Sequence, residues 1–261
     1  MWAQAEIGLH FLIQKTKIKI SKASIYQFES FFHLHFLNES ITLSYTDEAK
    51  LPRILKIFEN SSVNSVEVIH FNSAPSIIPI KFYDRDINAK YLETNTGTIN
   101  DIEEDISADQ KINVVYSKNK DLSKSLGLDK QKFIHINHFT QLYNYLSGVV
   151  DNSDGLSFFI KISSRSFEIM IFNKNEFVFF NTYEIVDENE FLYYTFFVLK
   201  NFQSSIKNDK IIFIGKHEIF DKYYNLASKY SRIDFIEDDT HSILNFEENF
   251  FSVINANNIR D

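Results

Sequence analysis

The stretch that decides the fold is residues 156–185, LSFFIKISSRSFEIMIFNKNEFVFFNTYEI, in which three runs of strand-forming residues are separated by short polar turns. Val, Ile, Phe and Tyr dominate the runs, and such residues favour pleated, half-buried strands. The runs and the turns between them are, in order, 156–162, 163–166, 167–172, 173–175 and 177–183. The stretch predicts a three-stranded antiparallel meander, and residues 186–202 behind it predict a helix.

A similar order of elements recurs through the chain. We match the predicted strand 111–116 with 210–215, and the predicted strand 132–136 with 232–236. Sequence identity between the matched segments is negligible, so the repeat is one of element order alone. It predicts an α/β protein of two tandem halves that face a cleft and meet near the linker-like residues 148–155. The predicted parts are an N-terminal half, 1–148, with an inserted segment around 74–110, and a C-terminal half, 149–261.

Composition narrows the partners and the compartment. The chain has 261 residues and a formal net charge of −8, which disfavours binding to a nucleic-acid backbone. It has no cysteine, so disulfides and zinc thiolates are excluded. The sequence contains no apolar run of the ~18 to 20 residues that a membrane span needs. The N-terminus lacks the pattern of a signal peptide, and we expect a cytoplasmic location.

Glycine is scarce. The chain has 6 glycines, where average usage gives roughly 18. Phosphate-binding loops need clustered glycines so that backbone N–H groups can approach the anion closely. The sequence therefore holds no Walker loop, dinucleotide fingerprint or kinase glycine loop.

Four short stretches carry a resemblance to a known family. They are IIPIKFYD at 77–84, NVVY at 113–116, IHINH at 134–138 and FIG at 213–215. The chain resembles a bacterial family of unknown function with a reduced actin-like ATPase fold. It is also distantly similar to the pilus-assembly and cell-division actin homologues. The resemblance implies two ribonuclease-H-like halves, each a mixed sheet with an antiparallel meander plus helices.

The resemblance also implies where ATP and magnesium would bind. Catalytic members of the superfamily hold ATP between two phosphate hairpins, each with an Asp-x-Gly core. Here Lys161 stands at the Asp position and Ser163 at the Gly position, followed by Ser164, and only Gly215 remains of the paired glycines of the adenosine loop. A ribonuclease-H-type nuclease needs an acid on the first strand, and residues 156–162 contain none. We predict no catalytic residue and no metal ligand.

Three functions stay open on this basis. The preferred one is a non-catalytic, pseudo-ATPase module that binds an unknown protein partner or itself. The second is a divergent protein that still binds ATP with magnesium in the cleft between the halves, through Lys161, Ser163, Ser164 and Gly215. The third is a nuclease or metal hydrolase that uses acids elsewhere in the chain.

The helix behind the meander carries a separate prediction. Its segment 190–202 is apolar nearly all round, which predicts burial on more than one side. If Tyr193 and Phe197 are both largely exposed instead, they indicate a contact surface for a partner.

Overall fold

The computed structural model describes most of the central part of the chain. The described residues are 22–28, 31–36, 39–44, 65–71, 73–96, 101–118, 132–150, 155–163, 165–205 and 209–236. The chain divides into two compact units, residues 1–140 and 141–261, and each is described by itself. The predicted helices at 47–60, 121–126 and 241–254 lie outside the described residues.

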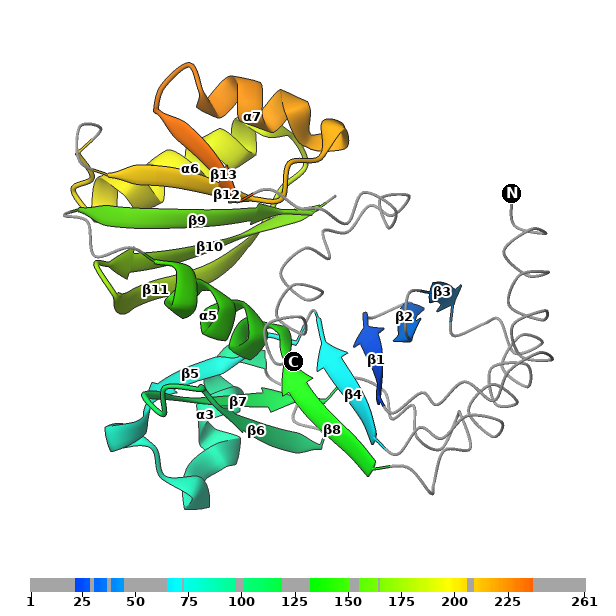
Figure 1. Ribbon diagram of the computed structural model, residues 1–261. Coiled ribbons are helices and arrows are strands. Elements are labelled where there is room, and N and C mark those ends of the chain that lie inside the picture. Colours follow the sequence, from blue (N-terminus) through cyan, green and yellow to red (C-terminus); the bar gives the residue numbers. More distant parts are fainter. Residues whose placement is uncertain are drawn as a thin grey trace. The chain divides into compact units, whose positions relative to one another are not determined.

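The second unit is built on a five-stranded mixed sheet. Its strands are β9 (Leu156–Ile162), β10 (Ser166–Asn173), β11 (Glu176–Glu184), β12 (Lys210–Ile214) and β13 (Ile233–Ile236). Their order across the sheet is β11-β10-β9-β12-β13 (Figure 1). The first three pair antiparallel, whereas β12 runs parallel to both β9 and β13. The predicted meander is therefore confirmed, since the predicted strands 156–162, 167–172 and 177–183 end within one residue of the observed ones.

Helices cover one face of this sheet (Figure 1). They are α6 (Glu188–Asn201), η3 (Glu218–Phe220) and α7 (Asp221–Ala227). The α6 N-terminus is capped by Asp187, whose carboxylate accepts hydrogen bonds from two backbone N–H groups of the first turn. Because side chains alternate along a strand, Phe158, Ile160 and Ile162 of β9 all face these helices and form the core of the unit.

The helix α6 is buried on one side only, so the prediction of burial on several sides is wrong. Phe191 and Val198 are buried against the sheet and α7. Tyr193 is 65% exposed and Phe197 is 50% exposed. The physical reason is that α6 and α7 lie in one layer on the sheet, and no further layer of the described residues covers the outer face of that layer. The sequence offered a contact surface for a partner as the alternative for these two side chains, and that alternative stays a prediction.

The first unit contains a sheet with the same topology. Its strands are β1 (Lys22–Gln27), β2 (Phe31–Phe36), β3 (Glu39–Ser44), β4 (Ser65–His70) and β8 (Lys132–Asn137), in the order β3-β2-β1-β4-β8. Strand β8 thus matches β13, as expected from the sequence. The match of 111–116 with 210–215 is wrong, because β4, rather than the strand at 112–117, occupies the place of β12.

A separate three-stranded sheet lies between β4 and β8 in the chain. It consists of β5 (Ser76–Pro79), β6 (Ile102–Ile106) and β7 (Ile112–Ser117), with β7 in the middle and antiparallel to both neighbours. The connection from β5 to β6 contains η1 (Ile80–Phe82), η2 (Arg85–Ile87) and α3 (Asn88–Thr96), whose Leu92 packs on Val115 and Ile78. The polar composition of residues 93–110 predicts a solvated loop, but the stretch includes strand β6.

One helix crosses the boundary between the units. The helix α5 (His138–Val149) begins in the first unit and belongs to the second from Gln141 onward. The expected linker 148–155 begins inside this helix, and its residues 151–154 lie outside the described ones. Within the described part of the chain, every helix is too short or too polar to cross a membrane.

Candidate functional site

The turn between β9 and β10 holds two of the four candidate nucleotide-binding residues, Lys161 and Ser163. The Ser163 N–H donates to the Ser166 carbonyl over 2.8 Å and closes the turn. Lys161 lies on the face of the sheet opposite α6, because Ile160 and Ile162 on either side of it face the helical core. Ser164 lies outside the described residues.

The Lys161 side chain is buried and paired with a carboxylate. Its Nζ lies 3.2 Å from Oε2 of Glu168, the residue directly across from it on β10. The Lys161 side chain is 3% exposed and that of Glu168 17%. A buried ammonium group needs a counter-charge, because the protein interior does not replace its hydration. Glu168 supplies that charge, so the ammonium is held at the sheet.

Sequence reasoning missed Glu168. Residues 161–166 contain no carboxylate, so the turn itself gives no sign of an acid nearby. The antiparallel register of the hairpin nevertheless puts Glu168 opposite Lys161, just as it puts Ser166 at the far end of the turn from Ser163. Glu168 could have been found from the sequence by counting cross-strand partners outward from the predicted turn, because this puts residue 168 opposite residue 161.

The fourth candidate, Gly215, follows β12 and is held by its own neighbours. Its φ of 74° is one that glycine adopts without steric cost. Its N–H donates to the Ile236 carbonyl over 2.9 Å, and its carbonyl accepts from the Tyr224 hydroxyl over 3.2 Å. Burial raises the pKa of the Tyr224 phenol to about 12, so the group stays protonated and able to donate. Because β12 is parallel to β9, Gly215 and the Lys161–Ser163 turn lie at the same end of the sheet, beyond the carboxyl ends of these two strands.

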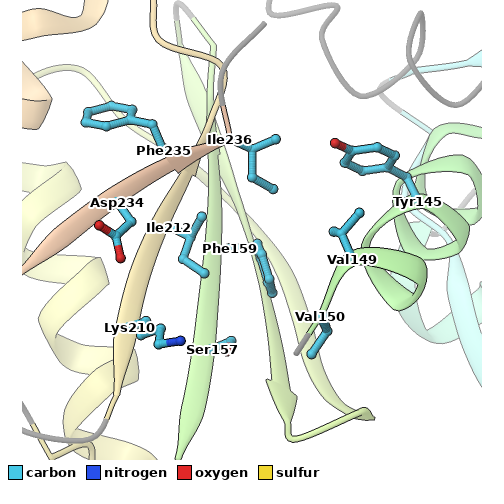
Figure 2. A pocket seen from close by; sticks show the side chains of 10 residues that line it. All are labelled: Tyr145, Val149, Val150, Ser157, Phe159, Lys210, Ile212, Asp234, Phe235 and Ile236. Atoms are coloured by element: carbon cyan, nitrogen blue, oxygen red, sulfur yellow. The ribbon is translucent and has the colours of Figure 1, made fainter. Parts of the chain in front are cut away.

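A pocket of about 390 Å³ lies within the second unit, on the sheet face that carries Lys161 (Figure 2). Figure 2 shows side chains from α5 on one side of it and side chains from the strands on the other. Its apolar walls include Tyr145 and Val149 of α5 and Phe159 and Ile212 of the sheet. The charged residues of its lining are Lys210 and Asp234. This apolar cavity suits an apolar group better than a nucleotide phosphate.

The first unit contains a half-buried carboxylate at the start of α5. Asp105 of β6 accepts from the Asn137 N–H over 2.6 Å and from the Thr140 hydroxyl over 2.9 Å. The Tyr116 hydroxyl donates to its other oxygen over 3.3 Å. Burial raises the pKa of Asp105 to about 6, although these hydrogen bonds favour the charged form. Asp105 thereby ties the three-stranded sheet to the N-terminus of the helix, which is a structural role.

Two histidines form a pair near Tyr116, whose ring centroid lies 5.6 Å from that of His70. His70 Nε2 and His135 Nδ1 lie 2.9 Å apart on the neighbouring strands β4 and β8. Burial, followed by the charges of His135 and Lys118, lowers the pKa of His70 to about 3, so His70 is neutral at pH 7. Among the described residues, no three His, Asp or Glu side chains are grouped so as to hold a metal ion.

An aromatic row leads from the core of the second unit to its surface. Tyr183 of β11 stacks on Tyr194 at 4.9 Å between ring centroids, and Tyr194 meets Tyr193 at 5.3 Å. Tyr193 in turn lies nearly parallel to Phe197, with centroids 6.4 Å apart and an interplanar angle of 20°. Each ring is supported by the one behind it, so the two exposed rings are held in place.

Comparisons with known proteins place this fold. A family model described as "Protein of unknown function (DUF3822)" matches residues 10–233. No curated protein matches the chain.

The solved structures that are similar to this chain include the following two. The first is a protein of unknown function from Bacteroides thetaiotaomicron with an actin-like ATPase fold. Its TM-score is 0.70 at 14% identity, and the match covers 91% of this chain and 95% of that one. The second is a PilM–PilN type IV pilus biogenesis complex. Its TM-score is 0.59 at 9% identity, and the match covers 93% of this chain and 99% of that one. The predicted actin-like α/β fold in two halves and the resemblance to a pilus-assembly homologue are confirmed.

Proposed function

Since the chain belongs to this DUF3822 family and has the actin-like ATPase fold, we propose that it is a non-catalytic module that acts by binding another protein or a second copy of itself. The observation that carries the proposal is the Lys161–Glu168 pair at the β9–β10 turn. The resemblance implies an aspartate at the position of Lys161 in the catalytic members of the superfamily.

The chemistry of phosphoryl transfer explains why this pair matters. Transfer depends on magnesium and on donors that stabilise charge on the moving phosphoryl group. An ammonium group cannot ligate magnesium, which takes oxygen ligands. The Glu168 carboxylate is 3.2 Å from that ammonium and neutralises it. The pair therefore supports a protein without hydrolytic activity.

Two further observations support a role in protein binding. Tyr193 and Phe197 form an exposed aromatic pair on α6, and aromatic side chains are enriched at the centres of protein interfaces. The PilM of the similar structure is found in a complex with PilN, so a protein with this fold takes part in a protein complex.

The second candidate function is nucleotide binding without hydrolysis. The observation that favours it is the shared sheet edge of Ser163 and Gly215, since ligands of open α/β sheets bind beyond the carboxyl ends of their strands. In this version Lys161, Ser163, Ser164 and Gly215 contact ATP with magnesium.

Two measurements on the purified chain separate these functions. We expect no phosphate release from magnesium-ATP above background, and no change on Lys161→Ala. Turnover that disappears in Lys161→Ala refutes the non-catalytic proposal. Thermal unfolding with and without magnesium-ATP tests binding alone, because a ligand at a hundred times its Kd stabilises by about 2.7 kcal/mol. A shift of that size with no turnover selects the second candidate.

A further inference from the structure

The open face of α6 is made of six exposed residues that repeat in mirror order along the helix. The exposed residues of α6 are Asn189, Glu190, Tyr193, Phe197, Lys200 and Asn201. Thr195, buried on the opposite side, marks their midpoint. The six residues form three pairs, and the two members of each pair lie equally far before and after Thr195. One pair has identical side chains, one has opposite charges and one is aromatic. The pairs are Asn189 with Asn201, Glu190 with Lys200, and Tyr193 with Phe197.

This order makes the face complementary to itself. When two copies of α6 lie antiparallel about a two-fold axis at Thr195, Glu190 of one copy lies beside Lys200 of the second copy, and the reverse contact forms as well. Tyr193 meets Phe197 of the second copy at the centre. Parallel helices would instead put Glu190 against Glu190. Charge therefore favours one orientation over the other.

The groups concerned are already positioned. Oε2 of Glu190 accepts from the Val186 N–H over 3.0 Å, which leaves its other oxygen for a cation. Tyr193 and Phe197 are stacked on each other, and Tyr194 supports Tyr193 from behind. Ordering these rings therefore costs little entropy on association, which favours their use as the centre of an interface.

We propose that a second copy of this chain binds the open face of α6, forming an antiparallel two-fold dimer. The inference deepens the proposed function, on which it rests, by naming the partner. The centre of the interface is the pair Tyr193 and Phe197, with the contacts between Glu190 and Lys200 on either side of it.

Sedimentation velocity of the full chain over a series of concentrations tests the dimer. We expect a monomer–dimer equilibrium that weakens as salt is added, because the outer contacts are exposed. Glu190→Lys and Lys200→Glu should each weaken self-association about tenfold, since each turns two attractive contacts into repulsive ones. An equimolar mixture of the two variants should dimerise at least as well as the wild type, because both contacts are then attractive again.

The mixture also separates a lost contact from a lost fold, since misfolded variants do not restore each other. Phe197→Ala should weaken the dimer further, whereas the control Phe82→Ala, at a 67% exposed aromatic in the first unit, should not. A chain that stays monomeric at every concentration, or a mixture no better than its parts, overturns the inference. A monomer without ATP turnover leaves the proposed function standing, whereas ATP turnover refutes that function whatever the oligomeric state.

Discussion

Replacing Glu168 with glutamine removes the negative charge that lies 3.2 Å from the buried Lys161 ammonium, while the shape of the side chain hardly changes. Removing one partner of a buried ion pair typically costs about 3–5 kcal/mol, because the remaining charge stays desolvated. Lys161 is almost fully buried and Glu168 keeps 17% of its surface in water. The glutamine oxygen also still accepts a hydrogen bond from Nζ. We therefore expect the lower end of the range, a loss of about 3 kcal/mol.

The assay is urea unfolding followed by far-ultraviolet circular dichroism. A loss of this size is a large fraction of the roughly 5–15 kcal/mol that stabilises a typical domain, so the midpoint should move clearly at an unchanged slope. The matched control is the double variant Lys161→Met with Glu168→Gln, in which both charges of the pair are removed together. It should regain most of the lost stability.

Two results would refute this reasoning. A Glu168→Gln variant as stable as the wild type would mean that the pair is solvated. A double variant that loses the sum of the two single losses would mean that the residues do not interact.

Two further predictions concern other buried groups. Burial raises the folded-state pKa of Asp105 to about 6, above its usual 3.8, so the folded state binds a proton more tightly than the unfolded state. The contribution of Asp105 to the free energy of unfolding is therefore fully present below pH 4 and is lost as the pH rises to 6. In urea titrations at pH 4, 5, 6 and 7, wild type should therefore lose stability relative to Asp105→Asn as pH rises, and parallel curves would contradict this. Tyr224→Phe removes the hydroxyl that donates to Gly215 and accepts from the His217 N–H, and should cost about 1 kcal/mol in urea unfolding; an unchanged midpoint would count against these bonds.

Local patterns predicted more of the fold than long-range pairs did. The β9–β11 meander follows from residue type and turn length alone, because its partners are neighbours in the chain. Strand β6 was missed because its acids read as solvent-exposed, whereas Asp105 faces the start of α5. Strand β4, rather than the strand at 112–117, pairs with β1. The order of elements along the chain could not predict this, because it does not say which strands pair across long connections.

The candidate site shows the same division. The positions of Lys161 and Gly215 at one sheet edge follow from the predicted strands. Glu168 required the register as well, and the His70–His135 contact joins residues 65 positions apart. The exposure of α6 was unpredictable from its composition, because burial depends on how many layers cover a helix rather than on how apolar it is.

The place of β9 in its sheet also bears on how the chain is made. Its partner on one side, β10, follows after a short turn, but its partner on the other, β12, begins at Lys210. During synthesis from the N-terminus, the meander is complete while the β12 side of β9 still has no neighbour. That edge belongs to a run of Phe and Ile and is the kind that pairs with other chains. Until about thirty further residues have been made, from the end of β11 at Glu184 to the end of β12 at Ile214, we expect newly made chains to aggregate through this edge and chaperones to bind it.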